Sequence, residues 1–131
     1  MDTPRFKKAL LIDDNDIDNF INKKLLVKTR FALDIVEKKS ASSALDYLRS
    51  AKEMKEELPD IIFLDIMMPV MDGFDFLDEF DTLSDEIKTH SKIIMLSSTE
   101  SFKDLNRANS NKYVHKFLNK PLTEMVLAAI Q

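Results

Sequence analysis

Residues 61–73 read IIFLDIMMPVMDG, an apolar run that ends in a carboxylate and leads into a loop with the only glycine of the chain. A continuous apolar run, without the polar alternation of a half-exposed strand, is typical of a strand covered on both faces. Pro69 and the Asp72-Gly73 pair favour a turn. The stretch therefore predicts a buried strand over 61–64, with Asp65 at its carboxyl end and a shaped loop after it.

Further apolar runs recur along the chain and alternate with segments of helical spacing. They lie at residues 9–12, 93–96 and 113–114 with 117–118, and a mixed run at 31–36 has the character of a half-buried strand. Strands that alternate with helices predict an α/β fold with a parallel sheet, and right-handed crossovers place helices on both of its faces. No repeat or linker is visible, so residues 1–131 are expected to form one domain.

The helical segments carry apolar residues three and four positions apart. In the first, Ile17, Phe20, Ile21 and Leu25 follow this spacing, which is typical of the inward face of an amphipathic helix. One helix, with Phe74 as its first apolar residue, is expected between the strands at 61–64 and 93–96. Shorter helical segments follow at 102–108 and from about Thr123 to the end.

The composition fits a globular domain and excludes several classes of protein. The chain has 131 residues, 15.1 kDa and no cysteine, which excludes a disulfide scaffold, a cysteine zinc finger and thiol chemistry. A net charge of -4 argues against a non-specific nucleic-acid binder. The apolar runs are too short for a membrane helix, and 9–12 is too short for a signal-peptide core. We expect a soluble, cytoplasmic protein that binds neither nucleic acid nor membranes.

Polar residues stand where the predicted strands end. They are Asp13 and Asp14, Asp65, Ser97, and Lys120. Ligands of an open α/β sheet bind at the carboxyl ends of the strands, where the strand order reverses. A strand order of 2-1-3-4-5 would make the strands that end in Asp13-Asp14 and in Asp65 neighbours.

Three carboxylates in one crevice repel each other, so either one retains a proton or a hard divalent cation neutralises them. Oxygen ligands at an open site suit Mg²⁺, which shares its remaining positions with phosphate. A carboxylate beside such a cation and a lysine can attack a phosphoryl group. The pattern therefore predicts acyl-phosphate chemistry on Asp65.

These motifs together resemble the response-regulator receiver domain of two-component signalling, and the resemblance covers essentially the whole chain. The resemblance implies a flavodoxin-like, doubly wound (βα)5 fold, a three-layer sandwich with a parallel sheet in the order 2-1-3-4-5. It also implies a single-domain regulator similar to chemotaxis regulators, without an output domain in this chain, and a cis peptide between Lys120 and Pro121.

The resemblance also implies a role for each site residue. Asp65 is the phosphoacceptor, and Asp13, Asp14, Asp65 and the Met67 backbone carbonyl hold Mg²⁺. Lys120 pairs with a phosphoryl oxygen. Ser97 supplies a hydroxyl that moves toward the phosphoryl group, and Phe117 matches the aromatic residue that then turns inward.

The same resemblance indicates partners. The phosphodonor is expected to be a sensor histidine kinase or a histidine phosphotransfer protein. The output surface is expected around the helix at 102–108, the following strand and the last helix. A downstream protein then binds that surface, and the chain is a monomer or a weak phosphorylation-dependent dimer.

Two other functions stay open at this point. A phosphohydrolase of the haloacid-dehalogenase type also uses an aspartate nucleophile and Mg²⁺, but that family has a second aspartate where this chain has Met67. We therefore expect no turnover of external substrates and no enzyme beyond self-phosphorylation and self-dephosphorylation. A receiver-like interaction module that is never phosphorylated is the other alternative. Asp16 and Asp18 are expected only to suit the dipole at the start of a helix.

Overall fold

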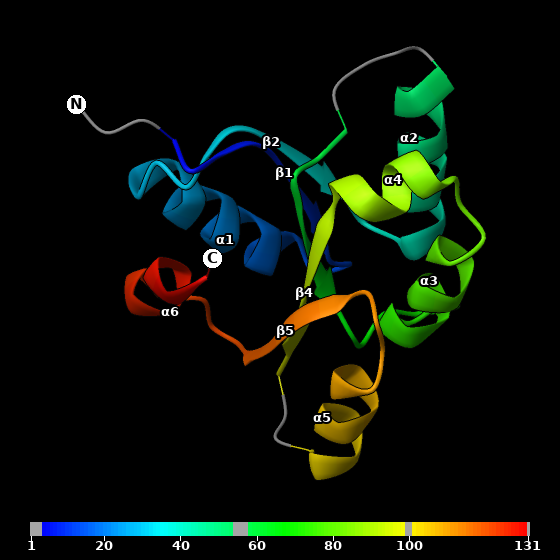
Figure 1. The fold of residues 1–131 in the computed structure, drawn as a ribbon. Helices are drawn as coiled ribbons and strands as arrows, with labels where there is room; N and C mark the ends of the chain where they lie inside the picture. Colours follow the sequence, from blue (N-terminus) through cyan, green and yellow to red (C-terminus); the bar gives the residue numbers. More distant parts are fainter. Residues whose placement is uncertain (1–3, 54–57, 99–100, 131) are drawn as a thin grey trace.

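A computed structural model describes residues 4–53, 58–98 and 101–130 of the protein and shows a five-stranded sheet in the order β2-β1-β3-β4-β5 (Figure 1). Every pair of neighbouring strands is parallel. The strands are β1 (Phe6–Ile12), β2 (Ala32–Lys38), β3 (Ile61–Asp65), β4 (Lys92–Ser97) and β5 (Val114–Asn119). The predicted flavodoxin-like fold and strand order are therefore confirmed.

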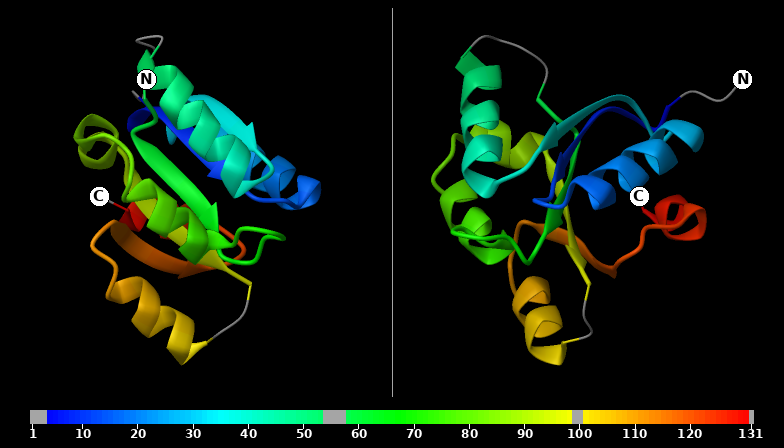
Figure 2. Two further views of the ribbon diagram at one scale, coloured as in Figure 1. Left: turned by 90° about the vertical axis from the view of Figure 1, so that its right-hand side faces the viewer. Right: turned by 180° about the vertical axis from the view of Figure 1, so that it is seen from behind.

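Helices cover both faces of the sheet (Figure 2). Those within the described residues are α1 (Asp16–Lys28), α2 (Ala41–Glu53), α3 (Gly73–Phe80), α4 (Asp85–His90), α5 (Phe102–Asn109) and α6 (Glu124–Ala129). Alternate residues of β1 enter different cores. Leu11 packs in one cluster with Leu26 of α1 and Leu127 of α6, whereas Leu10 packs in the other with residues of α2 and α3 such as Leu48. The central strands β1, β3 and β4 are largely buried on both faces, as their continuous apolar runs predicted, whereas β5 at the edge of the sheet is only partly buried.

Helix α4 is an element that the sequence analysis did not predict. It follows α3 before β4, so two short helices stand where one was expected. Ser84 caps its start by accepting a hydrogen bond from the Ile87 N–H, and Ile87 is its buried residue. With one apolar side chain in six residues, the segment shows no helical periodicity in the sequence.

Helix α1 presents a different face to the core from the one predicted. Ile17, Phe20 and Ile21 are 69%, 65% and 50% exposed, and the buried residues of the helix are Asn19, Asn22 and Leu26. The Asn19 side-chain amide donates to the Asp13 carbonyl at 2.8 Å. The inward face of the helix thus makes a polar contact with the end of β1. The expectation of a buried apolar stripe was wrong for Ile17, Phe20 and Ile21, whereas Leu25 is partly buried against the core.

None of the helices in the described part of the chain has both the length and the apolar character needed to cross a membrane.

Candidate functional site

Three carboxylates meet at the carboxyl edge of the sheet. Asp65 is the last residue of β3, and Asp13 and Asp14 follow β1 directly. One carboxylate oxygen from each residue can be chosen so that all three atoms lie within 4.8 Å of one another. Asp13 and Asp65 are buried, whereas Asp14 is exposed. The structure therefore brings together the acidic residues that the sequence predicted, with one side of the cluster open to solvent.

The position of Asp13 follows from the pairing of β1 with its two neighbours. Its backbone N–H donates to the Lys38 carbonyl at the end of β2, and Ile12 pairs with Leu64 of β3. Its side-chain Oδ1 accepts a hydrogen bond from the Asn15 N–H at 2.9 Å. Asn15 in turn caps α1. Oδ1 of Asp13 thus joins the end of β1 to the start of α1. The other oxygen of this carboxylate, Oδ2, faces the site.

Lys120 supplies the positive charge of the site. Its Nζ lies 2.6 Å from Asp13 Oδ2, 2.9 Å from Asp18 Oδ2 and 3.2 Å from Asp65 Oδ1. Its backbone N–H donates to the carbonyl of Ser97 at 2.8 Å, which ties the β5–α6 loop to the end of β4. The peptide bond from Lys120 to Pro121 is cis, as predicted.

Asp18 is a site residue that the sequence analysis missed. It was expected only to suit the dipole of α1, yet its carboxylate binds the ammonium group of Lys120. Asp16, two residues earlier, instead pairs with Lys39 at 2.7 Å. Asp18 lies in the first turn of α1 and its partner is 102 positions away in the sequence, so no local signal marks this contact.

Burial and charge shift the acid-base behaviour of the site. Burial, followed by the nearby Asp13 charge, raises the pKa of Asp65 to about 6, although Lys120 opposes the rise. Burial by itself lowers the pKa of Lys120, but hydrogen bonds to Asp13 and Asp18 outweigh it and hold the pKa above its usual range. Lys120 is thus a fixed cation, and the site contains more negative charge than one ammonium group offsets.

The donor set fits a magnesium ion. The cluster offers only oxygen atoms, one side of it is open, and its three carboxylates outnumber the single ammonium group of Lys120 beside them. Hard cations such as Mg²⁺ prefer oxygen ligands and retain several waters. Asp13, Asp14 and Asp65 can therefore hold such an ion. The Met67 carbonyl stays a predicted fourth ligand, and Met67 is 66% exposed.

Gly73 keeps the end of β3 in place. Its N–H donates to the Ile66 carbonyl at 2.8 Å, and a Cβ at this position would lie 2.8 Å from the Asp65 carbonyl oxygen and 2.9 Å from the Ile66 Cα. Both contacts are with backbone atoms, so no side chain can move aside to relieve them. The only glycine of the chain is therefore required by a close approach of α3 to the residue that follows Asp65.

Ser97 and Phe117 lie beyond the acidic cluster, on β4 and β5. Ser97 is buried at the end of β4 and pairs in register with Asn119. Phe117 is half-buried and pairs with Met95. Its ring lines a surface pocket together with residues of α5, namely Phe102 and Leu105. The predicted switch residues thus lie on adjacent strands between the acidic site and α5.

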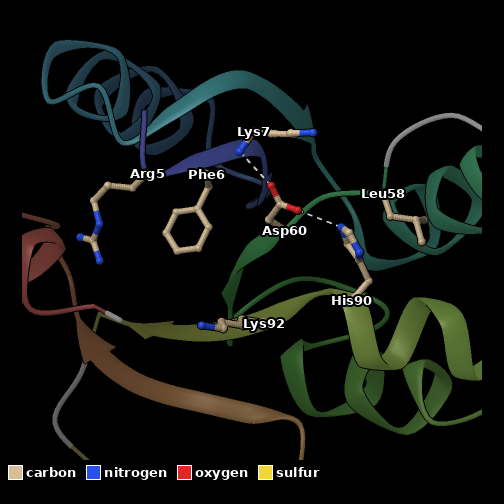
Figure 3. Close-up of a pocket in the computed structure, with 7 residues that line it drawn as sticks. All are labelled: Arg5, Phe6, Lys7, Leu58, Asp60, His90 and Lys92. Atoms are coloured by element: carbon tan, nitrogen blue, oxygen red, sulfur yellow. Dashed lines mark hydrogen bonds and ion pairs between the residues drawn. The ribbon is translucent and has the colours of Figure 1, made fainter. Parts of the chain in front are cut away.

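A second polar pocket lies at the opposite, amino-terminal edge of the sheet (Figure 3). Asp60 is at its centre and accepts a hydrogen bond from the Lys7 N–H at 2.8 Å. The other carboxylate oxygen lies 2.8 Å from His90 Nε2, at the end of α4. These contacts join β1 and α4 to the residue that precedes β3, so the Asp60 carboxylate has a structural role at the end of the sheet opposite the acidic cluster.

Comparison with known proteins defines the class to which this site belongs. Residues 9–130 match the model of the response regulator receiver domain, and the chain belongs to this family. It is similar to the probable methanogenesis regulatory protein FilR2 of Methanothrix harundinacea, with 31% identity over 114 residues, 87% of this chain and 72% of that protein. It is also similar to the chemotaxis protein CheY of Halobacterium salinarum, with 27% identity over 118 residues, 88% of each chain.

Solved structures agree with this assignment. The crystal structure of a two-component response regulator from Cytophaga hutchinsonii matches with a TM-score of 0.89 and 30% sequence identity, and the match covers 96% of this chain and 94% of that one. The chain is therefore a CheY-like response regulator receiver domain in both sequence and fold.

Proposed function

We propose that the chain is a phosphorylation switch in which Asp65 accepts a phosphoryl group from a phosphohistidine. The donor is a sensor histidine kinase or a histidine phosphotransfer protein, the partner class of the receiver family. One observation carries the proposal: the buried Asp65 carboxylate lies in a three-carboxylate cluster and 3.2 Å from the Lys120 ammonium group. That arrangement combines a nucleophile, a cation site and a fixed positive charge.

The transfer step balances without a further reactant. An Asp65 carboxylate oxygen attacks phosphorus, the new P–O bond forms as the P–N bond breaks, and the imidazole nitrogen leaves with the electron pair. Lys120 stabilises the negative charge on a phosphoryl oxygen through a charge-assisted hydrogen bond. Mg²⁺, when bound by Asp13, Asp14 and Asp65, neutralises the remaining negative charge. Hydrolysis of the acyl phosphate returns the free carboxylate.

The phosphoryl group changes the surface through Ser97 and Phe117. In this proposal the Ser97 hydroxyl moves toward the new phosphoryl oxygens, and the Phe117 ring turns into the space that it leaves. The half-buried ring next to a pocket lined by Phe102 and Leu105 supports a movement of this kind. The affected surface comprises α5, β5 and α6, where a downstream protein binds one of two pre-existing arrangements more tightly.

Intact-protein mass spectrometry tests the proposal. After incubation with Mg²⁺ and acetyl phosphate, the wild-type chain should gain one phosphoryl group that hydroxylamine removes. Asp65→Asn should gain none, whereas the control Asp34→Asn, which changes a carboxylate on β2, should label like the wild type. Equal labelling of Asp65→Asn and wild type would contradict the assignment of the nucleophile. No labelling of any variant would favour an interaction module that is never phosphorylated.

A further inference from the structure

Asp18 reaches the site from a part of the chain that the family motifs do not include. It lies in the first turn of α1, and its side chain is 37% exposed, compared with 14% for Lys120. The N-cap residue Asn15 already accepts hydrogen bonds from the Ile17 and Asp18 N–H groups. The Asp18 carboxylate is therefore not needed to cap the helix, and it binds the Lys120 ammonium group at 2.9 Å.

The three carboxylates around Lys120 are not equivalent. An ammonium group has three N–H donors, and Asp13, Asp18 and Asp65 each lie within reach of it. Asp13 and Asp65 also belong to the cluster that can hold a cation, whereas Asp18 does not belong to that cluster. Two partners of the lysine are thus shared with the metal site, and Asp18 is the partner that is not shared.

We propose that Asp18 is a positioning residue that keeps Lys120 beside Asp65 during phosphoryl transfer. The proposal rests on the proposed function. When a cation binds Asp13 and Asp65, their negative charge is shared with the ion and attracts Lys120 less strongly. Asp18 keeps its full charge for the lysine in that state. It therefore holds the ammonium group where an incoming phosphoryl oxygen needs it, although Asp18 itself is not a member of the cation cluster.

The location of Asp18 suits this role. A carboxylate in the first turn of a helix is stabilised by the helix dipole, and α1 has thirteen residues. The helix is joined to the end of β1 by the hydrogen bond from Asn19 to the Asp13 carbonyl. Asp18 is therefore attached to the same rigid strand end as Asp13 and Asp14. The lysine, by contrast, comes from the loop between β5 and α6.

The test compares Asp18→Asn with Asp16→Asn in the full chain. Asp16 lies in the same turn and pairs with Lys39, so its replacement removes the same charge from the same helix without touching Lys120. At saturating Mg²⁺, Asp18→Asn should slow phosphorylation by acetyl phosphate by about tenfold, in line with the loss of a charge-assisted hydrogen bond, and Asp16→Asn should stay within about twofold of the wild type. Asp18→Glu, which restores the carboxylate, should recover most of the rate.

Two further measurements separate positioning from other roles. The Mg²⁺ affinity of Asp18→Asn should stay within about threefold of the wild type, because the Coulomb interaction with a more distant charge is weak. The ¹⁵N signal of the Lys120 ammonium group should be sharp in the wild type and in Asp16→Asn, and broadened by solvent exchange in Asp18→Asn. Should Asp18→Asn fail to fold, Asp18→Ser takes its place and must show the same changes.

Each possible result of these measurements either supports the positioning role of Asp18 or overturns it. A wild-type rate in Asp18→Asn at saturating Mg²⁺, an equal loss of rate in Asp16→Asn, or an Mg²⁺ affinity of Asp18→Asn weakened well beyond threefold would each overturn the proposal. If the wild-type chain takes up no phosphoryl group, the proposed function fails, and the Lys120 signal then decides on its own whether Asp18 fixes the lysine. An unchanged ammonium signal in Asp18→Asn would overturn the positioning role in that case too.

Discussion

Asp65→Asn is predicted to stabilise the metal-free protein at neutral pH, although it removes an ion pair with Lys120. Asp65 is 4% exposed, and burial together with Asp13 raises its pKa from 3.8 to about 6 despite the opposing effect of Lys120. The folded state therefore disfavours the charged carboxylate. At about 1.4 kcal/mol for each pKa unit, the cost at neutral pH is about 3 kcal/mol. Because asparagine leaves Lys120 with one partner fewer, we expect a gain of about 1–3 kcal/mol.

The gain in stability of Asp65→Asn over the wild type depends on pH. The pKa of Asp65 in the folded protein is about 6, above the value of 3.8 for the unfolded chain. Between these values the folded state holds a proton that the unfolded chain has released, so the wild type loses stability as the pH rises through this window. Asp65→Asn has no such proton. The extra stability of Asp65→Asn is therefore fully present above about pH 6 and disappears as the pH falls to 3.8.

Urea unfolding in the presence of EDTA measures this difference. The free energies of unfolding of wild type, Asp65→Asn and the exposed control Asp34→Asn are compared at about pH 7 and about pH 4. The other carboxylates titrate in all three proteins, so their effect on the free energy of unfolding cancels when the variants are compared at the same pH. An Asp65→Asn protein that is no more stable than the wild type near pH 7, or whose advantage is the same at both pH values, would show that the folded protein does not disfavour the charged Asp65 carboxylate.

Three more substitutions test the local structure. Gly73→Ala is expected to cost about 1–3 kcal/mol and to slow labelling of Asp65, because its Cβ would lie 2.8 Å from the Asp65 carbonyl oxygen; wild-type stability and labelling would contradict this. Val70→Asn is expected to raise the free energy of unfolding by about 1 kcal/mol, because Val70 is exposed with a φ of 69° that asparagine tolerates better; a lower melting temperature would speak against it. Phe20→Ser is expected to change stability by no more than about 0.5 kcal/mol, because the ring is 65% exposed, and a loss above about 2 kcal/mol would mean that it packs inward.

The strands were predictable because burial on both faces leaves a strong local signal. Runs such as 61–64 have no polar residue, and their carboxyl ends must meet at one edge of a parallel sheet. The positions of Asp13 and Asp65 follow from that geometry. The order of the strands and the cis bond before Pro121 came from the resemblance to a family, and both are confirmed.

The orientation of α1 was not predictable from its apolar spacing. Periodicity shows that Ile17, Phe20 and Ile21 share a face, but not whether that face turns toward the sheet. In the structure the polar side chain of Asn19 points inward and binds the Asp13 carbonyl. A contact that depends on the end of a strand cannot be recognised from hydropathy within the helix.

The contact between Asp18 and Lys120 was hidden for a related reason. The two residues are 102 positions apart in the sequence, and an acid in the first turn of a helix has a sufficient local explanation. Only the placement of the β5–α6 loop beside the start of α1 brings the ammonium group to this carboxylate. Long-range side-chain partners of this kind require the three-dimensional structure.

The central claim is that the oxygen which accepts phosphorus belongs to Asp65, and chemical trapping tests it most directly. Borohydride reduces an aspartyl phosphate to homoserine, which peptide mass spectrometry locates within the sequence. After treatment with Mg²⁺ and acetyl phosphate, we expect homoserine at position 65 and at no other aspartate. An unmodified residue at 65, with the modification at another position, would contradict it.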